Sequence, residues 1–163
     1  MKKAFSVLLL SLLLLLVGCG TSKTKVKPIT KGIAFTCDVT YYNESYVCKG
    51  ETDQNGETVI EFLSPDDING LKFHFTKSGV TTSFKDTEYK APKIVFENSV
   101  ATFINEVLTA ENTAVFKEND VFYTDGVTDT FEYKLHLGGT GLPIKITTRP
   151  DAVEVVFREV KIK

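Results

Sequence analysis

After the N-terminal region, one segment has apolar residues at the spacing of a helix, and it runs from Asn98 to Glu111. Intervals of three and four residues place these side chains on one face of a helix. Asn98 or Ser99 can cap the first turn. The apolar stripe consists of Val100, Phe103, Ile104, Val107 and Leu108, and the other side is expected to carry mainly Thr102, Asn105, Glu106 and Thr109.

Elsewhere apolar and polar residues alternate, which is typical of strands with one buried face. Turns are expected at 77–79, Asp125-Gly126 and 138–141. Because no second helix is available, the helix must bury its stripe against a sheet. We therefore expect a mainly β fold with an antiparallel sheet and one packed helix. Strands are predicted at 33–39, 45–52, 57–63, 71–76, 80–85, 113–118, 121–124, 127–137, 142–148 and 152–162.

Two cysteines fall in the first predicted hairpin. If Thr40 pairs with Ser45, antiparallel register places Cys37 directly opposite Cys48. In a secreted domain this arrangement favours a disulfide between them, and two free buried thiols are the alternative. A metal site built from these cysteines with His74 or His136 is not expected, because none of these residues has the spacing of metal ligands.

The N-terminus has the pattern of a secretion signal. Lys2 and Lys3 precede an apolar run from Ala4 to Val17, which is shorter than the roughly 20 residues that span a bilayer. The run ends in Leu16-Val17-Gly18-Cys19, which resembles the cleavage motif of bacterial lipoproteins. We therefore expect residues 1–18 to be removed and Cys19 to carry a diacylglycerol, whose two chains anchor stably to a membrane. The chain would then lie on the extracytoplasmic face of the cell membrane.

Residues 19–32 are polar, contain four lysines between Lys23 and Lys31, and are expected to form a flexible tether. Residues 33–163 have the size and the 42% hydrophobic content that suit one β domain. Without Lys2 and Lys3, 17 basic residues stand against 21 acidic ones. This acidic balance does not favour a nucleic-acid partner.

No motif in the chain predicts catalysis. The sequence has no nucleophile elbow and no HExxH motif. The Gly138–Gly141 run leads into a strand pattern and not into a helix N-terminus, so it does not predict a phosphate site. Asp66 and Asp67 follow Ser64-Pro65 and fit a short helical turn better than a catalytic carboxylate pair. We expect no enzyme, no cofactor and no metal.

Two stretches carry a family resemblance. IEFLSPDDINGLKFHFTKSGVTTSF (60–84) and LPIKITTRPDAVEVVF (142–157), with the amphipathic helix between them, resemble small Firmicutes lipoproteins with a LolA/LolB-like fold. This is the fold of outer-membrane lipoprotein carriers. The resemblance implies a strongly curved antiparallel sheet, or incomplete barrel, with a helix packed on its concave face. In carrier members of the family, that hollow holds lipid acyl chains.

Two main functions remain open. The first is binding of a lipid or other apolar ligand, and the second is a protein-interaction module that senses or regulates an envelope or cell-wall enzyme. A hydrolase or other enzyme is a third, less favoured class. A deep cavity under the helix would favour the first, and a filled core with an exposed apolar patch the second. The candidate ligand or plug contacts are Phe73, Phe75, Val100, Phe103, Ile104, Val107 and Leu108.

Overall fold

The computed structural model describes residues 26–96, 98–111 and 114–163. The predicted signal peptide, Cys19 and residues 20–25 lie outside the described residues. Within the described ranges, no helix is both long and apolar enough to cross a membrane. The strands are β1 Ile33–Tyr41, β2 Glu44–Thr52, β3 Thr58–Ser64, β4 Lys72–Thr76, β5 Gly79–Phe84, β6 Thr87–Ala91, β7 Phe116–Glu118, β8 Val121–Val127, β9 Glu132–Leu137, β10 Pro143–Arg149 and β11 Val153–Ile162.

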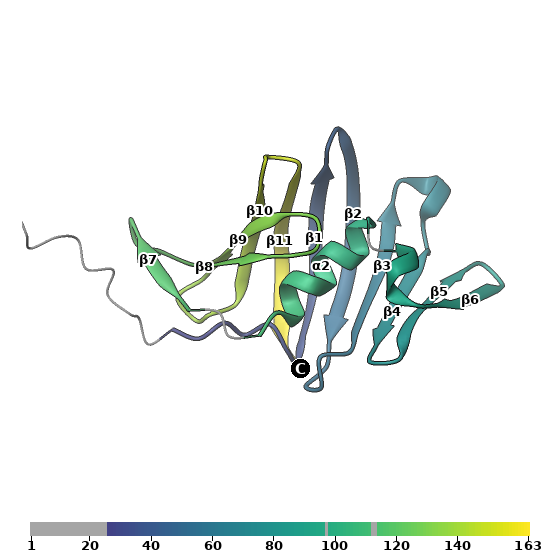
Figure 1. Ribbon diagram of the computed structural model, residues 1–163, viewed down its shortest axis with the longest axis horizontal. Helices are drawn as coiled ribbons and strands as arrows, with labels where there is room; N and C mark the ends of the chain where they lie inside the picture. The colour runs from purple at the N-terminus through teal and green to yellow at the C-terminus, as the bar shows by residue number, and fades with distance from the viewer. Residues whose placement is uncertain (1–25, 97, 112–113) are drawn as a thin grey trace, which may run out of the picture.

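All these strands form one antiparallel sheet in the order β6-β5-β4-β3-β2-β1-β11-β10-β9-β8-β7 (Figure 1). Strands that are consecutive in the chain pair with each other, except β6 and β7, and the two runs of hairpins are joined at the centre by the pairing of β1 with β11. The edge strands β6 and β7 do not pair with each other, so the sheet is not closed. The mainly β, antiparallel fold predicted from the sequence is therefore confirmed.

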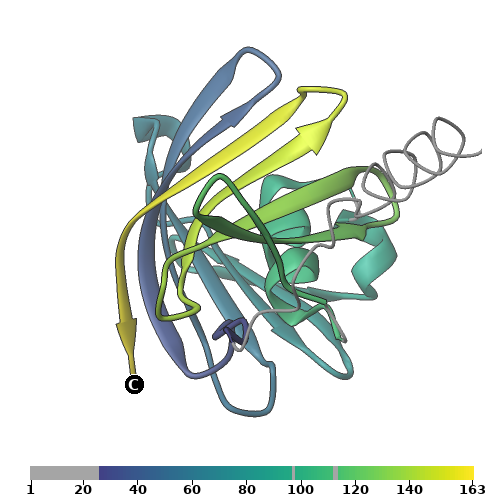
Figure 2. The same ribbon diagram turned by 90° about the vertical axis from the view of Figure 1, so that its left-hand side faces the viewer.

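One α-helix is described, α2 (Val100–Thr109), and it lies across one face of the sheet (Figures 1 and 2). Ser99 begins it, because its side-chain oxygen accepts a hydrogen bond from the Thr102 N–H at 3.1 Å. The apolar stripe is buried against the sheet, which removes its surface from water and stabilises the docked helix. Its members Val100, Phe103, Ile104, Val107 and Leu108 are each no more than 6% exposed.

The polar side of the helix differs from the prediction. Thr102 is fully buried and Asn105 is 7% exposed, although the sequence pattern places both on the solvent side. Thr102 takes part in the helix cap, where the Ser99 hydroxyl donates to Thr102 Oγ1 at 2.9 Å. On the polar side, Lys93 pairs with Glu106 at 2.8 Å. The polar side is therefore partly covered.

Several segments differ from the predicted ones. Asp125-Gly126 is not a turn but part of β8, and the turn lies at 128–131, where the Thr128 hydroxyl accepts from the Phe131 N–H at 3.0 Å. A Cβ at position 126 would overlap the Tyr133 side chain. Glycine therefore allows the Tyr133 ring to lie close to the β8 backbone and does not form a turn. Strand β6 and the short 3₁₀ helices η1 (Asp66–Ile68) and η2 (Lys93–Phe96) complete the fold. Neither β6 nor η2 is among the elements predicted from the sequence.

Candidate functional site

The seven apolar residues selected from the sequence meet in one core. Phe73 stacks on Phe75 with ring centroids 6.1 Å apart, and Phe96 meets Phe73 edge-on at 5.5 Å. These rings and the helix stripe belong to the same buried cluster. The space between α2 and the sheet is thus occupied largely by side chains. Six of the seven residues act as packing, and Val107 also reaches a hollow.

This hollow has a volume of about 520 Å³ and lies at the C-terminal end of α2. Val107 and Ala110 of the helix segment line it, and Leu135 of β9 forms part of its floor. Segment 27–31 forms the remaining wall, and we call this segment the strap. The lining therefore combines apolar side chains with the two lysines of the strap, Lys27 and Lys31.

The strap is held against the sheet by backbone contacts on both sides. The Ile29 N–H donates to the Gly141 carbonyl at 2.8 Å, and the Thr52 hydroxyl donates to the Thr30 carbonyl at 2.6 Å. The Ile29 side chain also packs on the core. From the sequence these residues are predicted to belong to a flexible tether, whereas in the structure segment 27–31 is docked on the domain.

Gly141 allows the strap to approach. Its φ of +90° is one that other residues rarely adopt, and a Cβ there would overlap the Lys27 carbonyl oxygen. The turn predicted at Gly138–Gly141 is confirmed by the hydrogen bond from the Gly141 N–H to the Gly138 carbonyl. The role of Gly141 in admitting the strap could not be found from the sequence, because the strap is more than 100 residues away in the chain.

Three buried oxygens have no hydrogen-bond partner among the described residues: Thr58 Oγ1, Asn105 Oδ1 and Thr124 Oγ1. An unpartnered buried polar group costs about 1–3 kcal/mol. Thr124 lies directly opposite Leu135, which lines the hollow, in the β8–β9 pairing. Asn105 lies on the helix two residues before Val107. None of the three residues is among the described residues that line the hollow.

Cys37 and Cys48 are directly opposite on β1 and β2, in the register that the sequence predicts. Both are fully buried and carry free thiols in the structure. A side-chain hydrogen bond with Cys48, together with burial, raises the pKa of Cys37 well above its usual range. Opposed residues in antiparallel strands have Cα atoms about 4.5 or 5.5 Å apart, and both distances suit a disulfide. The disulfide itself stays a prediction.

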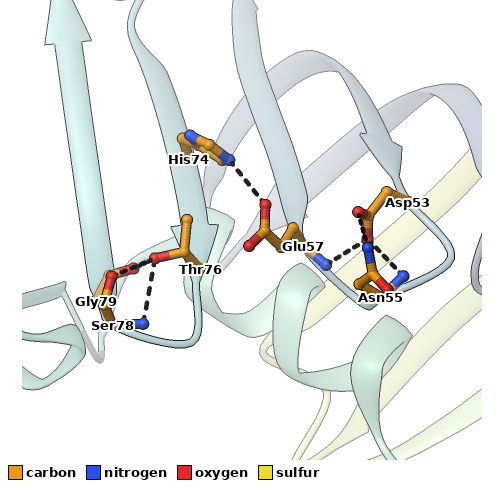
Figure 3. A network of polar contacts seen from close by, with 7 residues as sticks. All are labelled: Asp53, Asn55, Glu57, His74, Thr76, Ser78 and Gly79. Carbon is orange, nitrogen blue, oxygen red and sulfur yellow. Dashed lines mark hydrogen bonds and ion pairs between the residues drawn. The ribbon is translucent and has the colours of Figure 1, made fainter.

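The two histidines lie on the polar face of the sheet. His74 Nε2 is 3.8 Å from a Glu57 carboxylate oxygen, near the turn where Asp53 accepts hydrogen bonds from the Asn55 and Glu57 N–H groups (Figure 3). Partial burial, with Lys134 and Lys145 nearby, lowers the pKa of His136. In the described part of the chain, no group of three or more His, Cys, Asp or Glu side chains is placed to hold a metal.

A larger hollow of about 670 Å³ lies over β8, β9 and β10. Lys134 and His136 line it and alternate along β9 with buried Leu135, so it faces away from the apolar core. Its lining carries Asp125, Glu132 and Asp151 as well as Lys134 and Arg149. Such a mixed and strongly polar surface is less suited to an apolar ligand than the hollow beside the strap.

No family model and no curated protein matches this sequence. Solved structures do. An uncharacterized conserved protein from Thermus thermophilus matches with a TM-score of 0.55 and 11% identity, over 83% of this chain and 80% of that chain. At this identity the match shows a shared fold and nothing about function.

Two further solved structures match less closely. A LolA superfamily protein from Nitrosomonas europaea matches with a TM-score of 0.49 and 7% identity, over 85% of this chain and 89% of that one. A Vibrio parahaemolyticus domain named for outer-membrane lipoprotein sorting has a TM-score of 0.37 and 10% identity, with 84% and 87% covered.

Proposed function

We propose that this chain is a membrane-anchored extracytoplasmic lipoprotein with a LolA-like, strongly curved sheet, and that it binds a lipid or other apolar ligand without catalysing a reaction. The space under α2 is filled by side chains, so the observation that carries this proposal is the open hollow at the end of α2 and not a deep cavity under the helix. Its volume of about 520 Å³ falls in the range of small-molecule sites, and Val107, Ala110 and Leu135 give it apolar walls.

The predicted anchor would keep this hollow close to a bilayer. Cys19 precedes Lys27 of the strap by eight residues. Eight fully extended residues span at most about 29 Å, which is less than the thickness of a bilayer with its headgroups. Because the strap forms one wall of the hollow, a lipidated Cys19 would hold the site within reach of membrane lipids. This distance supports a lipid in preference to a freely soluble ligand.

The proposal is tested by blocking the hollow with one side chain. Ala110 is exposed at the helix end and lines the hollow, so Ala110→Phe should fill it without disturbing the core. Ala34→Phe is the matched control, because Ala34 lines a separate hollow of about 390 Å³. We expect calorimetry with dodecanoate to show binding to the Cys19→Ser chain, at least a tenfold loss in Ala110→Phe, and no change in Ala34→Phe.

Dodecanoate that binds equally well to the Ala110→Phe variant would place the ligand elsewhere. A chain that binds no apolar probe at all would remove the proposal.

A second function is favoured by a different surface. Ile94 and Val95 of η2 are 70% and 55% exposed, beside the edge strand β6 and its Tyr89, which is 57% exposed. Exposed apolar residues next to an open strand edge are typical of protein-binding surfaces. This supports the alternative of a non-enzymatic module that senses or regulates an envelope or cell-wall enzyme. Ile94→Ser with Val95→Ser would then abolish crosslinking to one envelope protein in intact cells and leave dodecanoate affinity unchanged.

A further inference from the structure

We propose that the ligand of this hollow is an anionic amphiphile whose head group is held by Lys27 and Lys31 of the strap. This inference rests on the proposed function and adds the chemical class of the ligand. It follows from the position of the two lysines, from the charges around them and from the apolar wall opposite.

Both lysines belong to a segment whose backbone is held in place. Ile29 and Thr30, which lie between them in the chain, are hydrogen-bonded to Gly141 and Thr52 respectively. The Lys31 side chain lies beside the β2–β3 turn: a Cβ on Gly56 would be 3.6 Å from Lys31 Cε and 4.0 Å from Thr109 Cγ2. The Lys31 ammonium is therefore near the C-terminal end of α2 and beside the hollow.

The hollow is lined by two lysines and no described carboxylate. Many lysines of the sheet are paired with carboxylates, such as Lys49 and Lys72 with Glu61 and Lys145 with Glu154, although Lys77, Lys85 and Lys134 have no such partner among the described residues. Within the described ranges, neither strap lysine has an acidic partner within 4 Å, and the described lining contains no Asp or Glu. The hollow is therefore a cationic site on a chain with a net negative charge.

An anionic head group can bind near the C-terminal end of α2 only if a cation is also present there. The C-terminus of a helix carries a partial negative charge, which disfavours an anion close to it. Lys31 lies beside the last turn and offsets this charge. A cationic amphiphile would meet two ammonium groups and is disfavoured, whereas an anionic head group gains two charge contacts while its chain contacts Val107, Ala110 and Leu135. Fatty acids and anionic lipid head groups share this chemistry.

The test compares two probes that differ in their head group. Dodecanoate and dodecan-1-ol have the same chain length and are titrated into the full chain carrying Cys19→Ser. Two exposed charge contacts together are worth about tenfold in affinity, so dodecanoate should bind about tenfold more tightly than the alcohol. Raising the salt concentration should reduce this ratio, because the lysines are exposed.

A lysine double variant locates the effect. Lys27→Gln with Lys31→Gln should bring dodecanoate down to the affinity of the alcohol and leave the alcohol unchanged. The matched control, Lys77→Gln with Lys90→Gln, removes the same charge at exposed positions outside the hollow lining and should keep the preference. Phosphatidylglycerol and dodecanoate, compared on the same variants, separate a lipid head group from a free fatty acid as the source of the anion.

The outcomes separate this inference from the function on which it rests. If both probes bind with equal affinity and Ala110→Phe blocks them, the hollow takes apolar ligands but the head-group assignment is wrong. The assignment is also wrong if the control pair removes the preference as fully as the strap pair does. If neither probe binds, the proposed function fails and this inference fails with it.

Discussion

Cys37 and Cys48 share one buried position in the sheet, where each thiol has the other as its neighbour. We predict that a thiol–disulfide oxidoreductase outside the cytoplasm joins them, taking up two electrons while two protons are released. The closed loop is short, so the bond should add about 2–3 kcal/mol to the free energy of unfolding. Thiol counting under denaturing conditions on the secreted Cys19→Ser chain, purified without reductant, should find no free thiol. Two free thiols would refute the pairing.

Gly141 is the residue on which the position of the strap depends. Gly141→Ala should cost about 1–3 kcal/mol, because a side chain would adopt an unfavourable positive φ and would overlap the Lys27 carbonyl. Hydrogen exchange should then become faster at the Ile29 amide in particular. Gly139→Ala is the control in the same turn, since a Cβ there would meet nothing within 4 Å. Equal effects of the two changes would show that the strap does not depend on the contact with Gly141.

For single residues, the sequence predicts those contacts that depend on residues nearby in the chain. The Cys37–Cys48 register could be predicted, because a short hairpin fixes the pairing of its own strands. The Asp125-Gly126 pair predicts a turn, because Asp-Gly pairs often form turns, but Gly126 lies in β8, where a Cβ would overlap the Tyr133 side chain. Contacts between residues far apart in the chain, such as Gly141 with Lys27, leave no local signal.

Helix α2 is the element whose packing the sequence predicts best, and its stripe supports a stability prediction. Phe103 is 4% exposed and meets Phe131 edge-on, so Phe103→Ala should cost about 3–5 kcal/mol through lost burial and the cavity left behind. Denaturant melts measure this. Glu106→Ala, which removes only the partly exposed pair with Lys93, should cost less than about 1 kcal/mol.

A Phe103→Ala variant as stable as the parent would mean that the helix is not docked on the sheet.

The polar side of α2 and the strand β6 could not be predicted from the sequence pattern, for physical reasons. Amphipathic spacing identifies which face of α2 meets the sheet, but it cannot show what covers the opposite side. Thr102 and Asn105 are polar and yet buried. Strand β6 was missed because four of its five residues are exposed, so it lacks the apolar alternation that reveals a strand with one buried face.

For the whole molecule, the order of the strands follows mostly from hairpins between neighbours, which is why the antiparallel class could be predicted. The pairing of β1 with β11 joins the two ends of the domain and could not be derived from local pattern. The hollow combines three distant segments, namely the strap, the end of α2 and β9. Only the fold could place them together.

Anchoring is also a property of the whole chain. The motif Leu16–Cys19 predicts that Cys19 carries the lipid, and this position lies outside the described residues. Cell fractionation should find the parent in the membrane fraction, whereas Cys19→Ser should lose acyl attachment and shift to the soluble fraction. The anchoring proposal would be refuted by a Cys19→Ser chain that fractionates wholly with membranes.

Native mass spectrometry of the purified Cys19→Ser chain shows whether this protein binds a lipid in the cell, because a bound lipid stays with the chain during the measurement. We expect a population carrying one noncovalent lipid-sized mass, present in Ala34→Phe and lost in Ala110→Phe. A chain that carries no such mass and gains none on incubation with dodecanoate or phosphatidylglycerol would contradict this expectation.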